Sequence, residues 1–129
     1  MPLLKFHILR GRSEAEINAL LDAAHEAVLE AFRVPERDRY QIVFEHDAYM
    51  FRAQDTGLGI ERTEKFVLLE VVSRPRAKEA KQLFYRLLCE KLQTACGIPT
   101  TDVMVSFVIN GDDDWSFGGG RAQFLTGEL

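Results

Sequence analysis

An internal repeat constrains this chain more than any other feature of its sequence. Residues 3–46 are repeated without a gap by residues 67–110, in a register that matches Arg10 to Arg74. The identical pairs are Leu4/Leu68, Arg10/Arg74, Arg12/Arg76, Glu26/Glu90, Ala31/Ala95, Pro35/Pro99 and Asp38/Asp102. Such a repeat dictates the architecture, because each copy must fold as the same supersecondary unit.

The first repeat is predicted to be a strand, a helix and a second strand. Leu3–Leu9 is apolar with β-character, and a capping box at residues 13–16 then opens a helix. The apolar stripe of that helix consists of Ile17, Leu20, Leu21, Ala24, Val28, Ala31 and Phe32. Pro35 ends the connection, since the residue before a proline is pushed out of helical geometry. Tyr40–Phe44 is the second predicted strand.

The second repeat has the same parts. Its strands are predicted at Phe66–Val72 and Val103–Ile109, and its helix stops at Gly97 and Pro99. Between the repeats, residues 55–59 (Asp-Thr-Gly-Leu-Gly) indicate a loop or a short hairpin. The tail at residues 111–129 consists of an acidic turn, a glycine triplet and scattered aromatic residues.

Two such units predict an α/β (α+β) fold. Each strand–helix–strand unit joins parallel strands by a right-handed crossover. The result is a four-stranded mixed sheet with both helices on one face, in a single domain spanning residues 1–129. The strands carry apolar residues on both sides, so the uncovered face predicts a homo-oligomer that buries it.

Composition restricts the partners and the compartment. A net charge of −4 and a pI near 5.4 argue against general nucleic-acid binding, which needs a basic face. No apolar run reaches membrane length, and Lys5 and Arg10 interrupt the only N-terminal candidate for a signal peptide. Cys89 and Cys96 lie too far apart on one predicted helix to form a disulfide. We therefore expect reduced, buried thiols in a cytoplasmic protein.

The predicted topology gathers reactive groups at one edge of the sheet. Pro2 stands at the start of the first strand, and Asp38 precedes the parallel second strand. If the repeats are related by a pseudo-twofold axis, the first and third strands are antiparallel. The segment Ser73-Arg74-Pro75-Arg76 then lies beside Pro2. Arg10 and Arg12 occupy the equivalent positions in the first repeat, without a proline amine of the same protomer beside them.

Pro2 brings a distinctive chemistry to this edge. Its small side chain favours removal of the initiator methionine, which would leave a secondary amine with a reference pKa of roughly 7.7–8.0. Such an amine acts as a base, an acid or an iminium-forming nucleophile without a cofactor. Arginines lower its pKa, and Asp38 raises it. Arg74 and Arg76 supply forked donors that match a carboxylate.

These residues resemble the tautomerase superfamily, and within it the malonate semialdehyde decarboxylase branch. The resemblance covers nearly the whole chain. It is carried by Pro2, Asp38, residues 55–59, the segment 73–76 and the tail from Asp114 to Gly127. It implies a homotrimer and a cofactor-free site with catalytic Pro2, Asp38, Arg74 and Arg76. The tail would add a substrate-binding hydrophobic wall of Trp115, Phe117, Phe124 and Leu129.

The activity so implied is decarboxylation of a 3-oxo acid, most simply malonate semialdehyde to acetaldehyde and carbon dioxide. A tautomerase or hydratase of 2-oxo acids is the alternative enzyme, and a non-catalytic trimeric binding module is the alternative of another class. No metal site is expected, because His7, His25 and His46 share no metal-ligand spacing with a cysteine or carboxylate. The run Asp112-Asp113-Asp114 is interpreted as an exposed acidic turn.

Overall fold

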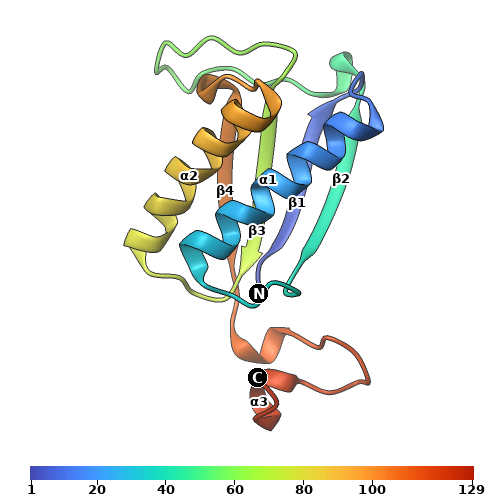
Figure 1. Cartoon of the computed structure of the whole chain (residues 1–129), viewed down its shortest axis with the longest axis vertical. Coiled ribbons are helices and arrows are strands. Elements are labelled where there is room, and N and C mark those ends of the chain that lie inside the picture. The colour runs from blue at the N-terminus through green and yellow to red at the C-terminus, as the bar shows by residue number, and fades with distance from the viewer.

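The computed structural model describes residues 1–129 as a four-stranded sheet with two long helices on one face (Figure 1). The strands are β1 (Leu3–Leu9), β2 (Tyr40–His46), β3 (Val67–Ser73) and β4 (Val103–Ile109). The helices are α1 (Glu14–Phe32), α2 (Lys78–Cys96) and the short α3 (Gln123–Thr126). Three short 3₁₀ turns are η1 (Ala48–Met50), η2 (Thr100–Asp102) and η3 (Asp112–Asp114).

The sheet confirms the predicted topology. Its strand order is β2-β1-β3-β4, so the two inner strands come from different repeats. Pairing is parallel within each repeat and antiparallel between β1 and β3, where Leu3 faces Val72. The repeats are therefore related by a pseudo-twofold axis. As a result, the start of β1 and the end of β3 lie at the same edge.

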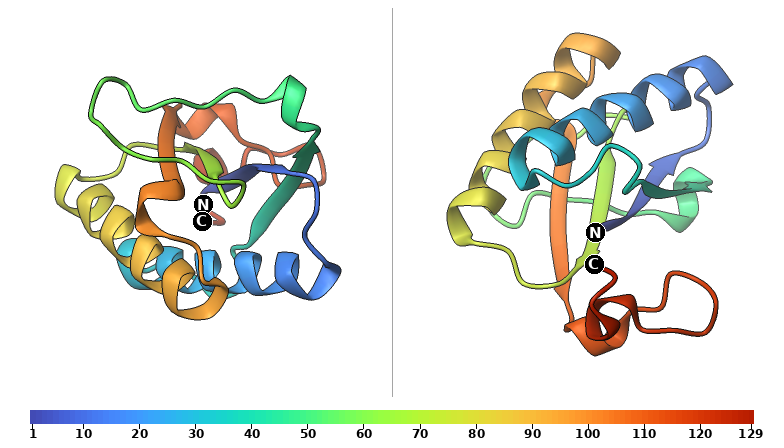
Figure 2. Two further views of the ribbon diagram at one scale, coloured as in Figure 1. Left: turned by 90° about the horizontal axis from the view of Figure 1, so that it is seen from above. Right: turned by 60° about the horizontal axis from the view of Figure 1, so that its bottom comes forward.

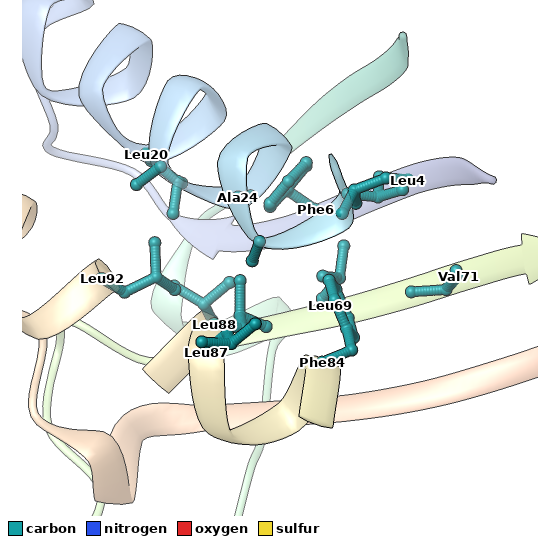
Figure 3. Close-up of a cluster of buried hydrophobic side chains, with 14 of the residues drawn as sticks. Leu4, Phe6, Leu20, Ala24, Leu69, Val71, Phe84, Leu87, Leu88 and Leu92 are labelled. Carbon is teal, nitrogen blue, oxygen red and sulfur yellow. The ribbon is translucent and has the colours of Figure 1, made fainter. Parts of the chain in front are cut away.

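The core fills the space between the helices and one face of the sheet. Alternate residues of the inner strands point into it, and Phe6, Ile8 and Leu69 have no exposed surface. Both helices present apolar stripes to the same layer, with Leu20 of α1 and Leu88 of α2 fully buried (Figure 3). Burying side chains of this size stabilises the fold by about 1.5–3 kcal/mol each relative to exposure.

The two long helices end at different types of residue in the same backbone conformation. Ser13 and Glu16 form the predicted capping box at the start of α1. At its end, Arg33 adopts a left-handed conformation with φ 53°. The corresponding residue at the end of α2 is Gly97, with φ 65°. Glycine adopts this conformation without a steric penalty, whereas a side chain such as that of arginine is strained in it.

The other face of the sheet has no helix over it (Figure 2). Apolar side chains stand on this face with substantial exposure, among them Ile42 (43%), Phe44 (39%), Met104 (42%) and Val108 (47%). These four side chains stand on the two outer strands, and exposed apolar surface on one face of a sheet usually marks an interface.

Two histidines lie in contact on this uncovered face, an arrangement that the sequence spacing did not predict. His7 and His46 lie on adjacent parallel strands, with their ring nitrogens 2.8 Å apart. Burial lowers the pKa of His7, and the charge of His46 adds to the lowering. One ring must donate and the other accept, so the pair requires at least one neutral ring.

The structure decides between the two alternatives for the segment that joins the repeats. Residues 51–65 contain no strand, so the glycine-containing turn at residues 55–59 belongs to a loop, one of the two predicted forms, and not to a hairpin. Asp55 holds this turn by accepting hydrogen bonds from the N–H groups of Gly57 and Gly59. Cys89 and Cys96 are free thiols, but both are only half-buried. No helix is long and apolar enough to cross a membrane.

Candidate active site

The two chain termini meet at one end of the sheet, where the tail folds beneath the start of β1 (Figures 1 and 2). A pocket of about 770 Å³ lies between them. Three segments line it: the loop from α1 to β2, the loop from β3 to α2, and the tail. Of the sequence-predicted site residues, it is lined by Asp38, Arg74, Arg76, Phe117, Phe124 and Leu129.

A carboxylate holds the N-terminus in this pocket. The amine of Met1 lies 2.9 Å from an Oδ atom of Asp38, whose side chain is 18% exposed. Burial lowers the pKa of this amine, the hydrogen bond to Asp38 opposes the lowering, and the charges of Arg76 and Arg74 add to it. The chain terminus is thus set between one carboxylate and two guanidiniums.

Pro2 does not line the pocket in this form of the chain. It is buried, and its nitrogen forms a tertiary amide with Met1. Met1 precedes Pro2 by one residue, and its amine contacts Asp38. The start of the chain therefore points toward Asp38.

The two arginines that follow β3 have different environments. Arg76 donates a hydrogen bond from Nε to the hydroxyl of Ser73 at 3.1 Å, and its guanidinium lies 5.1 Å from the ring centre of Phe32. Burial lowers the pKa of Arg76, and the charge of Arg74 adds to the lowering. Arg74 pairs with Asp112 at 3.1 Å and lies over Phe124 at 4.2 Å. Both guanidiniums are therefore held by side chains around the pocket.

The tail supplies an aromatic wall. Phe117 packs edge-on against Phe124, with ring centres 5.4 Å apart. Trp115 does not line the pocket: it stacks behind Phe117 at 5.6 Å and donates a hydrogen bond to Asn110. The side chain of Gln123 accepts from the N–H of Phe117, which closes the tail on itself. These contacts fix the wall even though the tail has little regular secondary structure.

Comparison with known proteins identifies the family of the chain. Two models of the family described as tautomerase enzyme match the chain, over residues 38–118 and residues 2–60. The probable tautomerase YrdN of Bacillus subtilis (strain 168) is 54% identical over 129 residues, covering 100% of both chains.

The chain belongs to the tautomerase superfamily.

Solved structures place it closer to particular members of the superfamily. A malonate semialdehyde decarboxylase structure superposes with a TM-score of 0.97 at 54% identity, covering 98% of each chain. The FG41 malonate semialdehyde decarboxylase, inhibited by 3-bromopropiolate, gives 0.94 at 37% identity, covering 98% of this chain and 97% of that one. A fused 4-OT symmetric trimer, at 24% identity and a TM-score of 0.77, shares the fold over 97% of this chain and 98% of that one.

At the opposite end of the sheet, the equivalent elements of the second repeat meet without a chain terminus. There Asp102 occupies the position equivalent to Asp38, but it has no exposed surface. It accepts hydrogen bonds from the backbone N–H of Thr63, at 2.7 Å, and from the hydroxyl of Thr63. The chain is continuous here, so a backbone N–H takes the place of an amine.

Arg10 and Arg12 also lie at that opposite end, away from the pocket of their own chain. Arg10 pairs with Asp47 at 3.0 Å and is largely exposed. Arg12 donates a hydrogen bond to the carbonyl of Lys65 at 2.7 Å, and burial lowers its pKa. The pair is engaged in holding the connection between the repeats.

Sequence reasoning missed several residues that line the pocket. These are Phe32, Arg33, Val34, Pro35, Glu36, Arg37, Tyr40 and Pro75. A comparison of the two repeats could have revealed two of these residues, because Arg33 and Arg37 correspond to the uncharged Gly97 and Thr101 in the second repeat. A basic residue found in only one copy points to this loop, but it does not single out pocket residues, because Arg39 corresponds to Val103 and lies outside the pocket.

The two equivalent aspartates give a matched test of structure against function. We predict that Asp102→Asn lowers the free energy of unfolding by about 1.5–3 kcal/mol, because an amide nitrogen cannot accept from Thr63. Asp38→Asn should lower it by less, since Asp38 is partly exposed and holds only the terminus. Urea unfolding at fixed protein concentration measures both. Equal losses would contradict the assignment of a structural role to Asp102 alone.

Proposed function

We propose that the protein is a cofactor-free decarboxylase of 3-oxo acids, with malonate semialdehyde as the simplest substrate. The observation that carries this is the convergence of a chain-terminal amine, the carboxylate of Asp38 and the guanidinium of Arg76 in one pocket. The similarity to malonate semialdehyde decarboxylases, at 54% and 37% identity, supports the same reaction.

The reactive group in this proposal is the amine of Pro2 after removal of Met1. Proline is small enough to permit that removal, and its nitrogen then becomes a secondary amine at the chain terminus. Asp38 raises the pKa of this amine and the arginines lower it, as they do for the amine of Met1. Because these effects on the pKa oppose one another, the amine can both give up and take up a proton.

Arg74 and Arg76 bind the substrate carboxylate in this proposal. Their planar guanidiniums offer paired donors to both oxygens. Binding in this manner can turn the carboxylate out of the plane of the carbonyl, so that the bond to be broken overlaps the π system. The aromatic wall of Phe117 and Phe124 favours neutral carbon dioxide over the bound carboxylate.

When carbon dioxide leaves, the electron pair of the broken carbon–carbon bond is delocalised onto the 3-oxo group. Two routes can stabilise this negative charge. In the first, protonated Pro2 hydrogen-bonds the carbonyl oxygen and transfers its proton to it as carbon dioxide leaves, which gives an enol. The enol takes a proton from water at carbon and returns its O–H proton to Pro2, which forms acetaldehyde. Alternatively, neutral Pro2 condenses with the aldehyde and loses water, forming an iminium that decarboxylates to an enamine. Protonation at carbon and hydrolysis then release acetaldehyde and Pro2.

The relatives favour a second candidate. YrdN is a probable tautomerase, and the malonate semialdehyde decarboxylase of 54% identity has decarboxylase and hydratase activities. Proton transfer on a 2-oxo acid, with Pro2 as the shuttle, uses the same residues, as does hydration with Asp38 activating water. A panel of malonate semialdehyde and enolised 2-oxo acids, followed by proton NMR, separates these enzymes. No turnover of any of them would favour a binding module.

The proposal includes a homotrimer that covers the helix-free face of the sheet. The exposed apolar side chains on that face, with Ile42 and Val108 both above 40%, supply the reason, and the fused 4-OT neighbour is a trimer. We expect sedimentation velocity to give the mass of three chains. A stable monomer at micromolar concentration would contradict the assembly.

The repeat provides a matched comparison for the carboxylate-binding arginines. We predict that Arg74→Ala and Arg76→Ala each lower kcat/KM for malonate semialdehyde by about 10²-fold or more, because a charge-assisted contact to substrate is lost. Arg10→Ala removes the equivalent of Arg74 at the closed end and should lower it much less. Arg12→Ala is the weaker control, since it also breaks the hydrogen bond to Lys65.

Proton NMR of acetaldehyde formation measures these rates, and sedimentation checks that each variant keeps its assembly. An effect of Arg10→Ala as large as that of Arg74→Ala, with the assembly intact, would contradict this placement of the carboxylate site.

Reductive trapping tests the iminium route. With borohydride and an aldehyde substrate, we predict a covalent label on Pro2, read by mass spectrometry of the N-terminal peptide. Label on a lysine such as Lys5, with Pro2 unmodified, would reject Pro2 as the nucleophile. Turnover without any label would support polarisation by protonated Pro2.

A further inference from the structure

Four arginines line the pocket, and only two of them are engaged by other side chains. Arg74 pairs with Asp112, and Arg76 hydrogen-bonds Ser73. Arg33 and Arg37 are exposed, and neither guanidinium forms a hydrogen bond or ion pair within the chain. Two cationic groups at the mouth of the pocket are therefore available to a ligand.

The charge of the pocket is opposite in sign to that of the whole chain. Four guanidiniums and the Met1 amine line it, together with three carboxylates, those of Glu36, Asp38 and the C-terminal residue Leu129. Asp38 is paired with the Met1 amine and Arg74 with Asp112, and positive charge remains in excess. The whole chain carries a net charge of −4. A locally positive cleft on an acidic protein attracts and concentrates anions.

The internal repeat shows that the two free arginines belong to the pocket end alone. Arg33 corresponds to Gly97 and Arg37 to Thr101, in a loop that otherwise shares its proline and its aspartate. Arg33 also adopts the left-handed conformation that Gly97 adopts freely. A strained side chain in place of glycine, next to a pocket, indicates a role for that side chain.

The pocket is also large for a three-carbon acid. Its volume of about 770 Å³ falls in the range of roughly 300–1,000 Å³ that holds drug-sized ligands. A short oxo acid held by Arg74 and Arg76 would fill only part of this volume, and Arg33 and Arg37 line the same pocket.

From these observations we propose that the preferred substrate is an oxo acid with a second carboxylate, bound by Arg33 and Arg37. The inference rests on the proposed function for the first carboxylate, which Arg74 and Arg76 hold. The 3-oxo group then lies between two anchored ends of the molecule. Malonate semialdehyde, which lacks the second carboxylate, would use only the inner half of the pocket.

Non-reacting acids test the proposal by binding alone. Isothermal titration calorimetry compares succinate, glutarate and adipate with butanoate, pentanoate and hexanoate, each diacid against the monoacid of the same length. The protein is the wild type, the double variant Arg33→Gly/Arg37→Thr, or the control Arg39→Ala. The double variant carries the residues of the second repeat, so its loop keeps a sequence that this fold already accommodates. Arg39 lies in the same loop as Arg33 and Arg37 but outside the pocket, and it pairs with Asp22 of α1.

We expect at least one diacid to bind wild type and Arg39→Ala about tenfold or more tightly than its matched monoacid, and this preference to fall below about threefold in the double variant. No preference in wild type, a preference that persists in the double variant, or an equal loss in Arg39→Ala would each overturn the proposal. Turnover of malonate semialdehyde is measured separately on the same proteins. Turnover without a diacid preference refutes this inference alone, whereas an Arg33- and Arg37-dependent preference without turnover refutes the decarboxylase.

Discussion

The antiparallel pairing of β1 with β3 is the constraint on which the rest of the structure depends. It joins the two repeats through their inner strands and pairs Leu3 with Val72. That register carries the chain terminus, one residue before Pro2, to the edge where β3 ends and Arg74 and Arg76 follow. The parallel pairing of β1 with β2, in which Leu3 lies opposite Tyr40, brings Asp38 to the same edge. A shift of one residue would turn every strand side chain to the other face.

A free chain end distinguishes the two otherwise equivalent edges of the sheet. At the pocket edge, Asp38 meets an amine that burial and two arginines disfavour in its charged form. At the other edge, the chain runs on through Thr63, and Asp102 is satisfied by its N–H and hydroxyl groups. One edge keeps a titratable base and open volume, while the other becomes a buried structural contact. The repeat supplies two similar edges, and the continuous chain at Thr63 fills one of them.

Sequence reasoning predicted the fold well, because the repeat and the apolar periodicity report directly on strands and helices. The capping box at Ser13, the antiparallel inner pair and the helices on one face all follow from local patterns. The loop between the repeats was less accessible, since a glycine-containing turn is compatible with a hairpin and with an irregular loop. Side-chain neighbours were hardest: only the register of β1 against β2 shows that His7 meets His46.

Titration of the chain terminus tests the central claim most directly, namely that the Pro2 amine is coupled to Asp38 and Arg76. In protein labelled with ¹⁵N-proline, the pKa of the Pro2 amine is read by NMR in wild type, Asp38→Asn and Arg76→Ala. The account predicts a lower pKa in Asp38→Asn, because a negative charge is removed, and a higher pKa in Arg76→Ala, because a positive charge is removed. A pKa unchanged in both variants, or a chain that retains Met1 when isolated from its natural host, would contradict it.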